Sequence, residues 1–212
     1  QEMFNEELSR HQGQNPYTAE DYFAYVDGKP RYDGVRDFLA SRGISLPEGD
    51  PCDGPDAQTI CGLGNRKNDL FNTVLARDGI QPYPGSRRWV DMLQAHGVAM
   101  AVISSSRNAA AVLEAAGLAE DFPVLVDGNR AKAEKLPGKP APDTYLKGAE
   151  LLGVRAEQCV VVEDAVSGVR AGAAGGFGMV LGVNRGVGAD RLRAAGADRV
   201  VDDLDEMVEE MA

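Results

Sequence analysis

Several residue types are scarce in this chain of 212 residues, and each shortage excludes a class of protein. Only two histidines are present, His11 and His96, and they lie far apart, so a zinc site built from cysteine and histidine is not expected. The three cysteines, Cys52, Cys61 and Cys159, are an odd number at wide spacing. They form no disulfide framework, which favours a reducing compartment.

Positively charged residues and long apolar runs are also scarce. The chain has 22 lysines and arginines against 33 aspartates and glutamates, a formal net charge of −11. This excess of negative charge argues against nucleic acids and anionic membranes as general partners. No apolar run approaches the ~18 residues that a membrane span requires, and no signal peptide is visible, so we expect a cytoplasmic protein. An anionic substrate would need a local cluster of lysine and arginine to attract it.

The remaining composition is that of a globular protein, and it is arranged in two different halves. Apolar residues make up 43% of the chain and charged residues 26%, enough to bury a sizeable core. The first half has helical spacing of apolar residues in "QEMFNEELSRH", "TAEDYFAYV" and "YDGVRDFLASRG", and a longer helical pattern over about 57–77. The prolines and glycine of "DGIQPYPGS" mark a boundary. We predict a helical domain over residues 1–81 and a second domain over 82–212.

The second half alternates short apolar strands with amphipathic helices. The expected strands are "VAMAVIS", "FPVLV", "CVVVE", "FGMVLGV" and "DRVV". This alternation predicts an α/β fold with a Rossmann-like parallel sheet covered by helices on both faces. In such a sheet the ligand site lies outside the carboxyl ends of the strands. The candidates for a site are therefore the residues that follow these ends or lie in the loops between them: Ser104, Ser105, Ser106, Arg107, Asn108, Lys139, Glu163 and Asp164.

The residue types at these positions suit a metal and a phosphate. Glu163 and Asp164 are hard oxygen ligands of the kind that hold Mg²⁺. The hydroxyl of Ser104, with the backbone N–H groups after it, suits a phosphate, and Lys139 supplies a point charge for one. Each has a structural alternative. Asp164 could cap the next helix while Glu163 faces solvent. Likewise Ser104 could be a simple N-cap, and Lys139 could be a solvated surface residue.

The order and spacing of these residues are more specific than any one of them. A serine at a strand end, then "KPAPDTYLKGAELLGV", then "CVVVEDAVSGVRAGAAGGFGMVLGV" resembles the haloacid dehalogenase-like (HAD) superfamily, and within it the β-phosphoglucomutase-like members. The resemblance covers essentially the whole chain. It implies a helical cap, a Rossmann-like core and Mg²⁺-dependent phosphoryl transfer through an aspartate. The implied partner is a small phosphorylated sugar, bound by a monomer or weak homodimer, with no nucleic acid and no membrane.

The resemblance assigns catalytic and metal-binding roles residue by residue. Ser104 matches the residue that holds the transferring phosphoryl group. Lys139 matches the lysine that neutralises the nucleophile and the phosphate. Glu163 and Asp164 match the acidic pair on Mg²⁺, which accounts for two adjacent carboxylates at the end of a buried strand.

Further matches assign contacts to the substrate. Arg31 in "YVDGKPRYDG" matches the cap arginine for the distal phosphate, and Lys67 in "GNRKNDLF" matches the cap lysine that faces the sugar. The structural alternative for both is a solvated helix surface. The core loop "SSSRN" matches the loop that also grips the distal phosphate, which adds Ser105, Ser106, Arg107 and Asn108 as substrate-binding residues.

One part of the family pattern has no counterpart in these residues. In the family, an Asp-x-Asp-Gly at the tip of the first strand, before the cap, supplies the nucleophile and the general acid–base. Here "QEMFNEEL" already resembles the first cap helix, and the "VDGN" at 126–129 follows the wrong strand. We therefore expect a sheet without its central strand and no activity from these residues alone. We also expect some ~20–30 further residues in the working protein.

Other hypotheses remain open. A non-catalytic relative that binds sugar phosphates or a protein partner is the main alternative, because of the absent Asp-x-Asp. Mutase and phosphatase activities both fit, since simple phosphatases can keep similar cap residues. A dehalogenase needs no metal and leaves the acidic pair unexplained. A receiver-like signalling domain leaves the helical half of about 80 residues unexplained.

Overall fold

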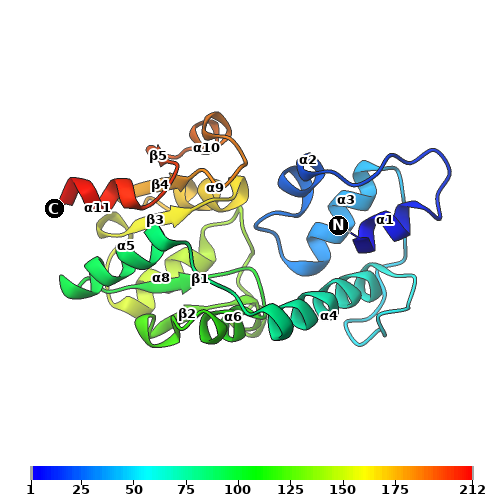
Figure 1. Ribbon diagram of the computed structural model, residues 1–212, viewed down its shortest axis with the longest axis horizontal. Helices are drawn as coiled ribbons and strands as arrows, with labels where there is room; N and C mark the ends of the chain where they lie inside the picture. The colour runs from blue at the N-terminus through cyan, green and yellow to red at the C-terminus, as the bar shows by residue number, and fades with distance from the viewer. Residues whose placement is uncertain (1, 212) are drawn as a thin grey trace. The chain divides into compact units, whose positions relative to one another are not determined.

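The computed structural model describes residues 2–211, and the chain divides between Gly79 and Ile80 into two compact units. Each unit has its own elements, most of which are labelled in Figure 1. None of the described helices is long and apolar enough to cross a membrane. The described part of the first unit has helices and no strand: α1 (Glu2–Leu8), α2 (Ala19–Asp21), a π-helix (Tyr22–Val26), α3 (Arg31–Ser41) and α4 (Ile60–Asp78).

The helical unit has an apolar core of its own. Phe38 on α3 is fully buried, and its ring centroid lies 4.5 Å from that of Phe4 and 4.9 Å from that of Tyr17. Aromatic pairs at this spacing stabilise the fold beyond the contribution of the apolar area that they bury. Thr18 caps α2, because its side-chain oxygen accepts a hydrogen bond from the backbone N–H of Asp21. The helices predicted in this half are therefore confirmed.

The second unit alternates strands and helices, as predicted. Besides two short 3₁₀ turns, Ala119–Asp121 and Ala156–Gln158, it contains α5 (Pro84–Ala95), β1 (Ala101–Ile103), α6 (Ala109–Ala115), β2 (Val124–Val126), α7 (Gly128–Ala133), α8 (Asp143–Leu152), β3 (Val160–Glu163), α9 (Val166–Ala174), β4 (Met179–Val183), α10 (Ala189–Ala195), β5 (Arg199–Val201) and α11 (Asp205–Met211). All strand pairs are parallel. Helix α7 falls in a segment that the sequence analysis left as a loop.

The strands form two separate sheets rather than one. Strand β1 pairs with β2, and β3, β4 and β5 pair in that order. On one face of the larger sheet, Leu181 and Val183 pack with Trp89 of α5, and on the other Gly172 of α9 lies against Val161. Both faces of this sheet therefore carry helices, and the division falls between β1 and β3. The sequence predicted one parallel sheet without its central strand, and the described strands form two parallel sheets.

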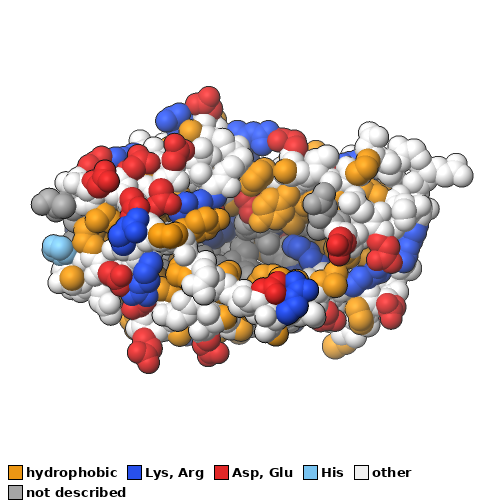
Figure 2. All heavy atoms as spheres, in the orientation of Figure 1, with side chains coloured by type: hydrophobic (Ala, Val, Ile, Leu, Met, Phe, Trp, Pro, Cys, Tyr) orange, Lys and Arg blue, Asp and Glu red, His pale blue; other side chains and the backbone are white. Residues whose placement is uncertain are grey.

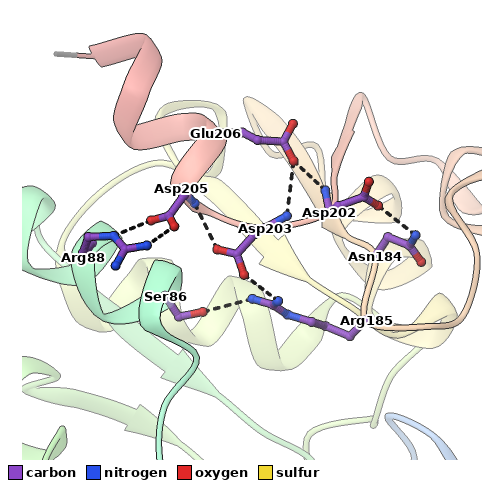
Figure 3. Close-up of polar contacts among 8 residues, drawn as sticks. All are labelled: Ser86, Arg88, Asn184, Arg185, Asp202, Asp203, Asp205 and Glu206. Carbon is purple, nitrogen blue, oxygen red and sulfur yellow. Dashed lines mark hydrogen bonds and ion pairs between the residues drawn. The ribbon is translucent and has the colours of Figure 1, made fainter.

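A network of charged side chains lies at the carboxyl ends of β4 and β5 (Figure 3). Arg185, after β4, donates hydrogen bonds to Asp203, after β5, at 2.8 Å and to the hydroxyl of Ser86 on α5 at 3.3 Å. Arg88 of α5 pairs with Asp205 at the start of α11. These charges are satisfied within the unit, so we assign the network a structural role that anchors α5. On the face drawn in Figure 2, acidic and basic side chains are interspersed rather than gathered by sign.

Candidate functional site

The first part of the site is the turn that follows β1. The backbone N–H of Ser104 still pairs with Val126, so this serine stands at the end of the ladder. Its Oγ accepts a hydrogen bond from the N–H of Ser106 at 3.1 Å, and the Oγ of Ser106 accepts one from the N–H of Asn108 at 3.1 Å. Helix α6 begins only at Ala109, so Ser104 is not a helix cap. Its hydroxyl oxygen accepts inside the turn, and a hydroxyl group also carries one proton that it can donate.

The loop after β2 holds this turn in place. Asp127 accepts hydrogen bonds from the N–H groups of Asn129 and Arg130, at 3.0 and 2.9 Å, and so caps α7. The side chain of Asn129 donates to the carbonyl oxygen of Arg107 at 2.9 Å. Asn129 and α7 were missed by the sequence analysis. An aspartate directly before a Gly-Asn pair was the local signal for this cap.

Lys139 joins the ends of the two sheets. Its side chain is buried, with the residue 8% exposed, which excludes the solvated alternative. Its Nζ donates to the carbonyl oxygen of Ile103, the last residue of β1, at 3.3 Å, and to Oε2 of Glu163, the last residue of β3, at 2.7 Å. Because Ile103 directly precedes Ser104, the ammonium of Lys139 lies close to Ser104. It also contacts Glu163 directly. The following helix begins at Asp143, with Pro142 as its N-cap.

Glu163 is held on both of its carboxylate oxygens. Oε1 accepts the backbone N–H of Ala165 at 3.1 Å, and Oε2 accepts the hydroxyl of Tyr145 at 2.5 Å as well as the ammonium of Lys139. Burial alone raises the pKa of Glu163, but the charge of Lys139 and these hydrogen bonds outweigh burial and lower the pKa. The carboxylate is therefore ionised at neutral pH. Burial, followed by the charge of Glu163, raises the pKa of Tyr145, which keeps the phenol a donor.

A glycine makes room for this carboxylate. A Cβ added to Gly168, in the first turn of α9, would lie 2.2 Å from Cδ of Glu163. Any side chain at position 168 would thus displace the carboxylate from its three donors. The sequence analysis did not single out Gly168 or Tyr145.

Asp164 differs from its neighbour in exposure. It is exposed, and the N-cap position of α9 belongs to Ala165, which makes no side-chain cap hydrogen bond. The described residues contain no group of three or more histidine, cysteine, aspartate or glutamate side chains placed to hold a metal. Mg²⁺ needs only one or two carboxylates when waters and phosphate oxygens complete its shell, so an exposed Asp164 fits this metal. Glu163, which accepts three hydrogen bonds from the protein, fits direct coordination less well.

The helical unit brings the predicted Arg31 together with two amides. The guanidinium of Arg31 donates to Oδ1 of Asn65 at 3.2 Å and to Oδ1 of Asn68 at 2.5 Å. The hydroxyl of Tyr32 donates to the same oxygen of Asn65 at 3.0 Å. Gly64 permits this packing, since a Cβ there would lie 2.6 Å from the ring of Tyr32. Amides orient the guanidinium without neutralising its charge.

Lys67 lies in the same cluster. It is half-buried, as Arg31 is. Burial, followed by the positive charge of Arg31, lowers the pKa of Lys67, while the charge of Asp27 acts in the opposite direction. Two half-buried cations near each other form a local positive field in an acidic protein. Such a field suits an anionic ligand.

Comparisons with known proteins identify the family of the chain. Residues 2–176 match the family described as haloacid dehalogenase-like hydrolase. The chain is 50% identical to the β-phosphoglucomutase of Mycobacterium bovis over 193 residues. The aligned region covers 90% of this chain and 74% of that protein. It is 32% identical over 190 residues to hexitol phosphatase A of Escherichia coli, covering 89% of this chain and 77% of that protein.

A solved structure with the same fold is the β-phosphoglucomutase of Clostridium difficile, with a TM-score of 0.77 and 20% identity over 99% of this chain and 87% of that one. The family match spans most of the chain, and the Mycobacterium bovis relative is similar over nearly all of it. The chain therefore belongs to the haloacid dehalogenase-like hydrolases and, within them, to the β-phosphoglucomutase-like subgroup.

Proposed function

We propose that this protein catalyses Mg²⁺-dependent phosphoryl transfer on a small sugar phosphate. The observation that carries the proposal is the buried Lys139–Glu163 pair, which lies at the carboxyl ends of β1 and β3 next to Ser104. A buried ammonium with a fixed carboxylate partner is suited to neutralise the charge on a transferring phosphoryl group. The similarity to a β-phosphoglucomutase and to a hexitol phosphatase supports the same chemistry.

The residues of the core unit take distinct roles in this proposal. The Ser104 hydroxyl donates to a phosphoryl oxygen, and Lys139 directs its charge to the same group. Asp164 is the carboxylate that would hold Mg²⁺, while Glu163 orients Lys139. When bound, Mg²⁺ would neutralise phosphate charge and orient the reacting group. The turn that contains Ser105, Ser106, Arg107 and Asn108 remains the proposed contact for a distal phosphate.

The helical unit carries two of the proposed substrate-binding residues. We assign Arg31 and Lys67 to the distal phosphate and the sugar, because their paired positive charges would be relieved by an anion. The sharpest form of the proposal is conversion of β-glucose 1-phosphate to glucose 6-phosphate. The 50% identity to a β-phosphoglucomutase favours this form over simple hydrolysis.

We further propose that the complete protein carries its nucleophile, an Asp-x-Asp-Gly, on a strand that pairs between β1 and β3. The division of the sheet at this place supports the proposal. So do Val160 and Val162 on β3, whose residues are 53% and 39% exposed although the strand is apolar. Intact-mass measurement with N-terminal sequencing of the purified protein tests this point. A mass of 22.6 kDa with Gln1 at the start would contradict it.

Product analysis tests the reaction. The complete protein is incubated with β-glucose 1-phosphate and Mg²⁺, and the products are followed by ³¹P NMR. Glucose 6-phosphate is the expected product. If the products are free glucose and inorganic phosphate, the protein is a phosphatase and the mutase form of the proposal is wrong. Binding of the sugar phosphate with no turnover would favour the non-catalytic alternative.

A further inference from the structure

Tyr145 contacts both members of the buried Lys139–Glu163 pair. Its hydroxyl donates to Oε2 of Glu163 at 2.5 Å, and the centroid of its ring lies 4.7 Å from Nζ of Lys139. Lys139 donates to the same Oε2 at 2.7 Å. The three side chains therefore form a closed triangle in which each contacts the other two. Tyr145 is 6% exposed, so water does not compete for these contacts.

The ring of Tyr145 is itself fixed by the fold. Phe177 packs its ring at 76° to that of Tyr145, with 5.9 Å between the centroids. Helix α8, which carries Tyr145, approaches β1 closely, since a Cβ added to Gly148 would lie 2.5 Å from Cδ1 of Ile103. A rigid aromatic residue on a helix packed against β1 is a precise support for groups at the ends of β1 and β3.

The consequence concerns where the ammonium of Lys139 points. An ammonium has three donors, and the carbonyl oxygen of Ile103 and the carboxylate of Glu163 take two of them. The direction of the third N–H group is set by the first two, so it depends on the position of Glu163. Removing the hydroxyl of Tyr145 would take away one of the two donors to Oε2 and let the carboxylate rotate. Misplacement of a catalytic group by about 1 Å is enough to lower a rate about 100-fold.

We propose that Tyr145 is a positioning residue for phosphoryl transfer, which holds Lys139 and Glu163 in the one arrangement that directs the ammonium at the phosphoryl group. This inference rests on the proposed function and assigns Tyr145 no contact with the substrate.

The test compares the complete protein with its Tyr145→Phe variant, which keeps the ring and removes only the hydroxyl. We expect kcat for the sugar phosphate to fall about 10- to 100-fold, with a smaller rise in KM of about threefold. Thr144→Val is the matched control. Thr144 is the neighbouring residue on α8, is 5% exposed, and its hydroxyl has no hydrogen-bond partner within residues 2–211. Its variant should keep kcat within about twofold.

Two further measurements separate an effect of the substitution on positioning from an effect on folding and from an effect on the reaction itself. Thermal unfolding of both variants gives the folded fraction by which kcat is corrected. Titration with inorganic phosphate, in the absence of Mg²⁺, reports the phosphoryl site without turnover, and Tyr145→Phe should bind phosphate more weakly by threefold or more, on the order expected for a displaced charged donor.

The outcomes distinguish this inference from the proposed function. A wild-type protein that transfers phosphate, beside a Tyr145→Phe variant with unchanged kcat, overturns the role of Tyr145 alone. A wild-type protein that binds phosphate without turnover overturns the proposed reaction, and the phosphate titration then decides the role of Tyr145. A wild-type protein that neither transfers nor binds phosphate overturns both.

Discussion

At the scale of single residues, the charges of Glu163 and Lys67 lie in opposite electrostatic environments. Glu163 has a lowered pKa because Lys139 and the hydrogen bonds to its two oxygens outweigh burial. Lys67 has a lowered pKa because burial and the charge of Arg31 both disfavour its ammonium. The first charge is satisfied inside the protein. The second is disfavoured in the folded protein, which is the state expected of a residue whose partner is a ligand.

Replacing Lys67 by methionine should separate stability from substrate binding. A folded-state pKa below 10.5 means that the ammonium lowers the free energy of unfolding at every pH below the folded pKa. This penalty disappears as the pH rises towards 10.5, where the unfolded chain also loses its proton. Lys67→Met should therefore melt at a higher temperature than the wild type at pH 7, with the difference shrinking towards pH 10. The KM for the sugar phosphate should rise about tenfold or more.

An unchanged KM for the Lys67→Met variant would remove Lys67 from the substrate site. An equal or lower melting temperature at pH 7 would show that its charge has a partner within the protein. Lys132→Met, on the exposed side of α7, serves as the control for removal of a lysine charge.

At the scale of elements, the first turn of α9 is shaped around the carboxylate of Glu163. Gly168→Ala places a Cβ only 2.2 Å from Cδ of Glu163, closer than the two atoms can approach. Alanine is favoured over glycine inside a helix by about 1 kcal/mol, yet we expect this variant to lose that much stability or more and to lower kcat about 100-fold. Gly34→Ala in α3 is the control, since its Cβ would meet atoms no nearer than 3.4 Å. Gly168→Ala with wild-type kcat would show that Glu163 does not need its present position.

The elements themselves were largely predictable, and their contacts were not. Apolar periodicity placed most helices and strands within a few residues of their bounds. The apolar pattern placed Ser104 at a strand end and Lys139 in a loop, and the resemblance to a family assigned both to a phosphoryl group. Tyr145 and Gly168 could not be found in this way, because their partner Glu163 lies on a different element and no local pattern marks a contact across elements. The sheet expected to lack a central strand proved to be two sheets, since backbone pairing needs a neighbouring strand.

At the scale of the whole molecule, two units with separate cores should unfold in part independently. The cluster of Phe4, Tyr17 and Phe38 belongs wholly to the helical unit. Phe38→Ala should lower the stability of that unit by about 3–5 kcal/mol. In hydrogen exchange, protection should fall over residues 2–79 and be retained over 80–211. An equal loss of protection in both would show that the chain unfolds as one cooperative body.

The central claim is that the ends of β1 and β3 form a phosphoryl-transfer site built around Lys139. The most direct measurement is the rate of phosphoryl transfer from β-glucose 1-phosphate, by ³¹P NMR with Mg²⁺, for the complete protein and its Lys139→Met variant. Lys132→Met is again the control. We predict turnover by the wild type and the control, and a loss of about 100- to 1,000-fold in Lys139→Met. A Lys139→Met variant as active as the wild type would contradict the account.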